Sequence, residues 1–163
     1  MAQPEQAIVL PIKNKSVMWM LLTIALLFTL TGTHAVDTCR KCDIKKVKVV
    51  HDNINVLTYG MIKDFLCTFD ATCSNNAEFS AFSNEMLFKV IEQSPGLFLK
   101  VLHKENMDNI PIILSEIRNP IQGGFKLKDL YEKVKGVSSH KAYKDKILEA
   151  LKVAADKQKV EIK

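Results

Sequence analysis

The chain has 163 residues, of which 47% are apolar and 25% are charged, with a net charge of +5 at pH 7. This length and apolar share are enough for one domain with a single hydrophobic core, and they exclude a disordered chain or a large multidomain machine. Only two basic residues, Arg40 and Arg118, are arginines, which phosphate recognition favours over lysine. We therefore expect no nucleic-acid partner.

Residues 1–35 have the features of an export leader. Lys13 and Lys15 precede an uncharged apolar run at 17–30, and the small and polar stretch 31–35 follows it. This order is typical of a secretory signal peptide, so we expect cleavage after Ala35. An uncleaved anchor is the alternative, but a membrane span needs about 20 apolar residues. We expect an exported protein, periplasmic or secreted, with no membrane span once the leader is removed.

Four cysteines follow the leader closely: Cys39 and Cys42 in the motif Cys-Arg-Lys-Cys, then Cys67 and Cys73. An even number of cysteines in an exported chain predicts disulfide bonds. The pairing stays open. Bonds Cys39–Cys42 and Cys67–Cys73 would close two small loops. Bonds from Cys39 and Cys42 to Cys67 and Cys73 would instead tie the N-terminal arm to the first helical hairpin.

A thiol redox site and a zinc site are the two alternatives to structural disulfides. A thiol redox site at Cys39 and Cys42 would normally follow a strand and open a helix, but this motif lies close to the expected mature N-terminus. A zinc site could use the four thiolates, or three thiolates with the imidazole of His51. The spacing of Cys67 and Cys73, however, is wider than zinc motifs usually have. We expect no cofactor and no bound metal.

Residues 36–50 are predicted to form an irregular arm that contains two of the cysteines and a cluster of basic residues. Such a cluster attracts an anionic surface or an acidic partner, and a solubilising role is the plainer interpretation. The basic residues are Arg40, Lys41, Lys45, Lys46 and Lys48.

Residues 51–163 are predicted to form a single helical domain, because apolar residues recur at i, i+3 and i+4. Asp52 or Asn53 is placed to cap the first helix, and Ser74 or Asn75 the second. The second helix is apolar around most of its circumference, so we expect it at the centre of the core. The predicted helices span 53–69, 74–93, 95–104, 111–118, 126–135 and 139–158.

About six short helices joined by short loops predict an all-α fold of antiparallel helical hairpins. The arrangement is a small bundle or a short array that resembles HEAT and armadillo repeats in the style of its hairpins. The sequence contains no repeat at the level of residue identity.

The sequence carries no serine-hydrolase elbow, zinc-protease helix or phosphate-binding loop. We therefore expect a non-catalytic protein that acts through contact with an unknown protein partner, as an adaptor, a scaffold or an inhibitor. Asn75, Asn76 and Asn84, together with Ser80 and Ser83, could form a polar notch that receives the backbone of that partner. Capping and close helix packing are the alternative roles of these residues.

Overall fold

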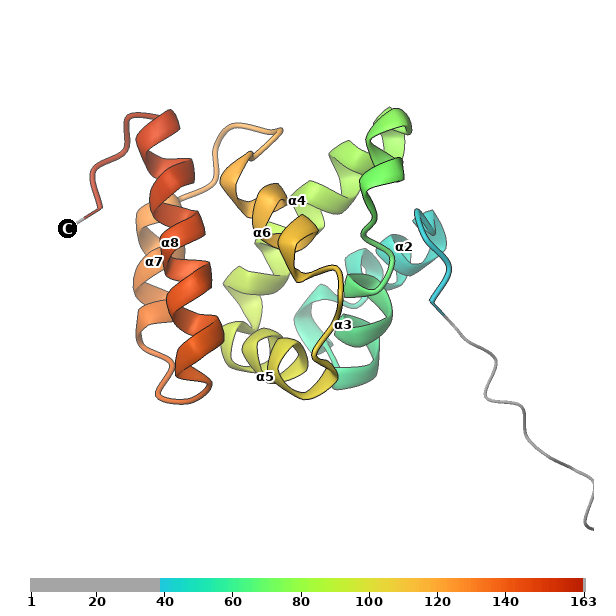
Figure 1. The fold of residues 1–163 in the computed structure, drawn as a ribbon, viewed down its shortest axis with the longest axis horizontal. Coiled ribbons are helices and arrows are strands. Elements are labelled where there is room, and N and C mark those ends of the chain that lie inside the picture. The colour runs from blue at the N-terminus through green and yellow to red at the C-terminus, as the bar shows by residue number, and fades with distance from the viewer. Residues whose placement is uncertain (1–38, 163) are drawn as a thin grey trace, which may run out of the picture. The chain divides into compact units, whose positions relative to one another are not determined.

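The computed structural model describes residues 39–162, which belong to one compact unit. The expected leader at 1–35 and residues 36–38 of the arm lie outside the described residues. Within residues 39–162 the chain forms seven α-helices and two short 3-10 helices, and no strand (Figure 1). The all-α prediction is confirmed. The elements are α2 (Ile44–Asp52), η2 (Ile54–Val56), α3 (Tyr59–Leu66), η3 (Ala71–Asn75), α4 (Ala77–Gln93), α5 (Pro95–Glu105), α6 (Ile110–Arg118), α7 (Leu127–Lys135) and α8 (Lys141–Lys157).

Helix α4 is the central element, as its apolar circumference predicts. It contacts α2, α5, α6 and α7. Met86, Leu87 and Phe88 point in different directions around its axis, and all three are buried. Because neighbours surround the helix, few of its positions are left to polar side chains.

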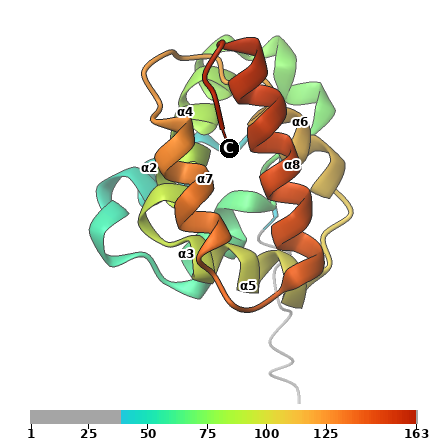
Figure 2. The ribbon, with the colours of Figure 1, turned by 90° about the vertical axis from the view of Figure 1, so that its left-hand side faces the viewer.

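Helices α7 and α8 form an antiparallel hairpin at one end of the unit (Figures 1 and 2). Helix α8 packs against both α7 and α6, so it joins the last hairpin to the rest of the bundle. Ile147 and Leu151 lie on its buried face, and Leu130 and Val134 are buried on α7. The hairpin style of packing agrees with the sequence-based expectation.

The prediction of an irregular arm at 36–50 is wrong for residues 44–50, which belong to α2. The Asp43 side chain accepts a hydrogen bond from the Lys45 backbone N–H at 2.9 Å and so caps this helix. Val47 and Val50 are completely buried. Their spacing of three residues was a helical signal, and burial against α3 and α4 outweighs the weak helix propensity of valine.

The first predicted helix, 53–69, is divided in the structure into η2 and α3. Thr58 caps α3 by accepting a hydrogen bond from the Met61 backbone N–H at 3.3 Å. Asn53 lies instead at the C-terminus of α2, where its side chain donates to the Val49 carbonyl. The other five predicted helices begin and end within three residues of the observed bounds.

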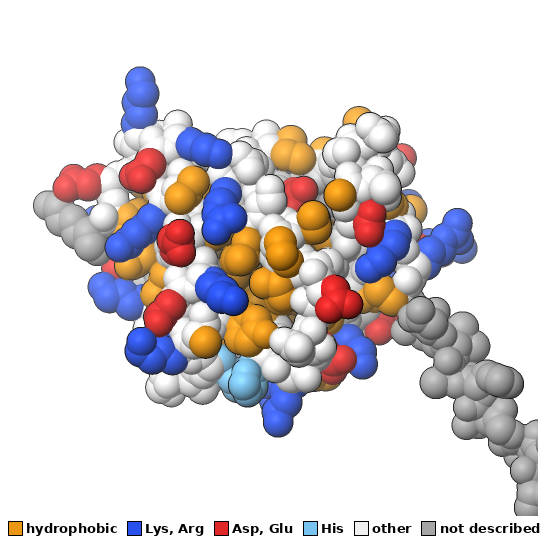
Figure 3. Space-filling model, viewed as in Figure 1, with side chains coloured by type: hydrophobic (Ala, Val, Ile, Leu, Met, Phe, Trp, Pro, Cys, Tyr) orange, Lys and Arg blue, Asp and Glu red, His pale blue; other side chains and the backbone are white. Residues whose placement is uncertain are grey.

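Figure 3 shows how side chains are distributed over one face of the molecule. Acidic and basic side chains are mixed across this face, and hydrophobic atoms gather around α6. None of the helices within residues 39–162 combines the length and the apolar character that a membrane crossing requires.

Candidate functional site

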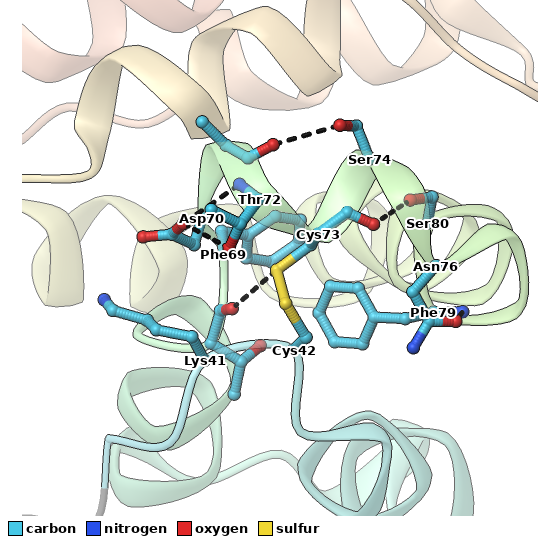
Figure 4. Close-up of a disulfide and its surroundings, with 12 residues drawn as sticks. Lys41, Cys42, Phe69, Asp70, Thr72, Cys73, Ser74, Asn76, Phe79 and Ser80 are labelled. Carbon is cyan, nitrogen blue, oxygen red and sulfur yellow. Dashed lines mark hydrogen bonds between the residues drawn. A yellow bond between two sulfur atoms is a disulfide. The ribbon is translucent and has the colours of Figure 1, made fainter.

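A disulfide between Cys42 and Cys73 ties the N-terminal arm to η3 (Figure 4). The two Cα atoms are 5.5 Å apart, although 31 positions separate the residues in the sequence. The rings of Phe69 and Phe79 lie beside the bond. Of the pairings that the sequence left open, the structure therefore has one crossed pair, and Cys42 is not bonded to Cys39.

Asp70 precedes η3 and caps its N-terminus. Its carboxylate accepts hydrogen bonds from the Thr72 backbone N–H at 3.0 Å and from the Thr72 hydroxyl at 2.7 Å. These two bonds hold the pKa of Asp70 below its ordinary value, and the ammonium group of Lys41 adds to the effect. A short acidic side chain at this position thus stabilises the turn that carries Cys73.

The arm runs along the end of α3 and is held there by hydrogen bonds. The Cys42 backbone N–H donates to the Thr68 carbonyl at 2.9 Å. The Cys39 thiol donates to the Cys67 carbonyl at 2.8 Å, and Lys41 Nζ donates to the same oxygen at 3.1 Å. Three residues of the arm are therefore fixed against one short stretch of backbone.

Beside this stretch lies a cavity of about 390 Å³, which we call the thiol lobe. Burial raises the pKa of the Cys67 thiol to about 12, and a hydrogen bond between the Cys39 and Cys67 side chains adds to the shift. Cys39 and Cys67 therefore lie together at the wall of this lobe. Its lining residues are Cys39, Lys41, Cys67, Asp70, Ala71, Met107, Asp108, Asn109 and Ile112.

Asn109, which lies just before α6 and lines the thiol lobe, links the start of α6 to the end of α3. Its amide nitrogen donates to the Leu66 carbonyl at 2.8 Å and to the Phe69 carbonyl at 2.9 Å. Its Oδ1 atom is buried and has no hydrogen-bond partner within residues 39–162. Leaving such an acceptor unsatisfied costs about 1–3 kcal/mol, so the two donated bonds must offset that cost.

A second cavity of about 220 Å³, which we call the serine lobe, adjoins the first. The two lobes share Asp70, Ala71 and Ile112, and together we call them the hollow. The Ser80 hydroxyl donates to the Cys73 carbonyl at 2.9 Å, and the Ser74 hydroxyl donates to the Ala71 carbonyl at 3.0 Å. The serine lobe is lined by Phe69, Asp70, Ala71, Cys73, Ser74, Phe79, Ser80, Ser83, Ile112, Ser115 and Glu116.

The structure does not bring together the three asparagines that were predicted to contribute to a polar notch with Ser80 and Ser83. Asn76 caps α4 by accepting a hydrogen bond from the Phe79 backbone N–H at 3.0 Å, and Asn75 is exposed on η3. Asn84 is fully buried, and its side chain bonds to the C-terminal end of α6 and the loop after it. The two serines of the predicted notch, Ser80 and Ser83, do line the hollow, together with Ser74 and Ser115, which were not predicted to be part of that notch.

The five basic residues of the arm are placed in different settings. Arg40, Lys41 and Lys45 line a shallow depression at the start of α2. Lys46 forms an ion pair with Asp64 on α3, and Lys48 is exposed on α2. An anionic partner for this arm stays a prediction.

Residues with metal-ligating side chains do not cluster in the described part of the chain. Within residues 39–162, no group of three or more His, Cys, Asp or Glu side chains is placed to hold a metal ion. His51 lies next to Asp52 and against the ring of Phe82, with ring centroids 5.5 Å apart.

Comparisons of the chain with protein-family models, with curated proteins and with solved structures find no match. The class of the molecule therefore follows from its own geometry. It is a small all-helical domain in which a disulfide fixes one wall of a two-lobed hollow.

Proposed function

We propose that this is an exported, non-catalytic helical protein that binds an extended segment of another protein in the hollow. The observation that carries the proposal is the adjoining pair of lobes between η3 and α6, which share Asp70, Ala71 and Ile112. Export is supported by the order of charged, apolar and small residues at 1–35.

The serine lobe has the chemistry to accept hydrogen bonds from a peptide backbone. Ser74 and Ser80 use their hydroxyl protons within the chain, so lone pairs on both oxygens are left to accept. An extended segment carries backbone N–H groups that require such acceptors when they leave water.

The thiol lobe offers an apolar surface next to the polar one. Met107 and Ile112 are half-buried and line this lobe, and hydrophobic atoms gather around α6 on the face shown in Figure 3. The segment we propose therefore has an apolar side chain in the thiol lobe and backbone N–H groups over the serine lobe.

The walls of the hollow are held in place before any partner arrives. The Cys42–Cys73 disulfide fixes η3, and Asn109 ties the start of α6 to the end of α3. A preformed surface loses less conformational entropy on binding, which favours recognition of a flexible segment.

The test is photo-crosslinking in the cells that produce the protein. A photoreactive amino acid replaces Ala71 or Ser115, which are both exposed and line the hollow. The matched controls are Ala142 and Ser139, which are exposed at or near the start of α8. We expect both hollow positions to crosslink to the same segment of one partner, and the controls to give no such product. Equal products at the control positions, or none in the hollow, would refute the proposal.

A substitution that fills the hollow is a second test of the same proposal. Ile112→Arg places a long charged side chain at one of the three residues that both lobes share, and Ile121→Arg makes the same change at an exposed position. We expect Ile112→Arg to abolish crosslinking from Ala71 and Ile121→Arg to leave it intact, with helix content unchanged by circular dichroism in both variants. Crosslinking that survives Ile112→Arg in a folded protein contradicts binding in the hollow.

A further inference from the structure

Cys39 and Cys67 lie together at the wall of the thiol lobe, although 28 positions separate them in the sequence. The Cys39 thiol donates a hydrogen bond to the Cys67 carbonyl at 2.8 Å, and both residues line the lobe. The backbone around them is already held by the Cys42–Thr68 hydrogen bond and the Cys42–Cys73 disulfide. The folded chain therefore holds the two cysteines side by side.

We propose that Cys39 and Cys67 are a dithiol that closes into a second disulfide by exchange with a disulfide-carrying molecule in the thiol lobe. Cys39 attacks the donor first, and Cys67 completes the bond. This redox chemistry goes beyond the proposed contact function and does not depend on it.

The surroundings of the two sulfurs differ in a way that assigns these roles. Lys41 Nζ lies 3.8 Å from Cys39 Sγ, and a lysine beside the sulfur is typical of a reactive cysteine. The Cys67 thiol donates to the Asp64 carbonyl at 3.2 Å, and burial keeps its pKa well above the ordinary value. The thiolate is the attacking form of a thiol, so Cys39 is the first nucleophile.

The exchange balances in two steps. The Cys39 thiol loses its proton to water, and its sulfur bonds to one sulfur of the donor. The donor S–S bond breaks, and the first donor thiolate leaves and takes up a proton. The Cys67 thiol then loses its proton, and its sulfur bonds to Cys39 Sγ as the second donor thiolate leaves and is protonated. Two protein thiols are oxidised to a disulfide, and one donor disulfide is reduced to two thiols.

The first experiment maps disulfides in the whole purified protein before and after treatment with oxidised glutathione. Trypsin cleaves after Arg40 and Lys41 and so separates Cys39 from Cys42, and a protease that cleaves before Asp70 separates Cys67 from Cys73. We expect Cys39–Cys67 to be present beside Cys42–Cys73 after treatment. Pairing of Cys39 with Cys42, or thiols at Cys39 and Cys67 that still react with an alkylating agent, would overturn the proposal.

Single variants test the order of attack. Cys67→Ser should trap glutathione on Cys39, because the second step cannot occur. In Cys39→Ser, glutathione should add to Cys67 at least about tenfold more slowly than it adds to Cys39 in Cys67→Ser. Equal or faster addition to Cys67 contradicts the assigned roles.

A lysine substitution tests the charge beside Cys39. Lys41→Met should slow the addition of glutathione to Cys39 in the Cys67→Ser background. Lys45→Met, which removes an exposed lysine of α2, should leave the rate unchanged. Equal rates in the two lysine variants would show that Lys41 does not assist the attack and would overturn its assigned part.

Discussion

Cys42 and Cys73 are bonded to each other across 31 positions of sequence, so the N-terminal arm and η3 form one covalent unit. The bond links the chain just before α2 to the segment that leads into α4. Because η3 also forms a wall of the hollow, the disulfide connects the stability of the fold to the shape of the candidate site.

Removing this bond should lower the free energy of unfolding. In the chain-entropy model, a loop of about 30 residues gives a loss of about 3–4 kcal/mol for the Cys42→Ser/Cys73→Ser double variant. Denaturant unfolding under non-reducing conditions measures the change. Cys42→Ser alone should cost a similar amount, since the same bond is absent. A loss below about 1 kcal/mol would show that the unfolded chain is not constrained as this model requires.

Asn84 should matter for stability far more than the exposed Asn75. The Asn84 amide nitrogen donates to the Glu116 carbonyl at 3.1 Å, and its oxygen accepts from the Ile121 backbone N–H at 2.9 Å. Asn84→Leu leaves these buried groups without partners, so we expect a loss of about 3 kcal/mol or more. Asn75→Ala serves as the control and should stay within about 0.5 kcal/mol of the parent protein. Thermal and denaturant unfolding compare the two, and similar losses would contradict the assignment.

Asp70 should make the protein sensitive to acid. Its pKa is lowered in the folded state by the bonds from Thr72, so its stabilising effect is present above the ordinary carboxylate pKa of about 4. The effect disappears as the pH falls through the lowered, folded-state pKa. The difference in unfolding free energy between the parent protein and Asp70→Asn should therefore shrink on acidification. Thr72→Val removes the hydroxyl donor and should reduce the same difference, and a difference that does not vary with pH refutes the prediction.

Glu105 should control the titration of Tyr59. The Tyr59 hydroxyl donates to Glu105 and so links α3 to α5, and Lys63 Nζ lies 2.8 Å from the other carboxylate oxygen. The hydrogen bond to Glu105, then burial, raises the pKa of Tyr59, while Lys63 and then Tyr59 lower the pKa of Glu105. Glu105→Gln should move the Tyr59 pKa back toward about 10. Alkaline absorbance titration detects this shift, with Tyr59→Phe identifying the signal.

The same interaction has a defined dependence on pH. Because the folded-state pKa of Tyr59 is raised, its contribution to stability is present below the unfolded pKa and is lost as the pH rises through the folded one. The stability advantage of the parent protein over Tyr59→Phe should therefore decline in alkali. An advantage that grows with pH would contradict the direction of the shift.

The helical class and the central helix were predictable because they depend on short-range periodicity. Phe79, Met86 and Val90 recur at helical spacing, and the chain around them offers no competing strand pattern. The helix at residues 44–50 was not predicted from the sequence, because Val47 and Val50 are poor helix formers in isolation. Their burial against α3 and α4, which no local pattern reports, stabilises α2.

Local patterns in the sequence were enough to predict the all-α class, the positions of most helices and the set of cysteines available for bonding. The approach of Cys42 to Cys73, the approach of Cys39 to Cys67 and the position of the hollow against α6 are visible only in the folded chain. The reason is that helix formation follows from neighbours three and four positions apart. The site instead depends on contacts such as Asn109 to Leu66, which form only when distant helices pack together.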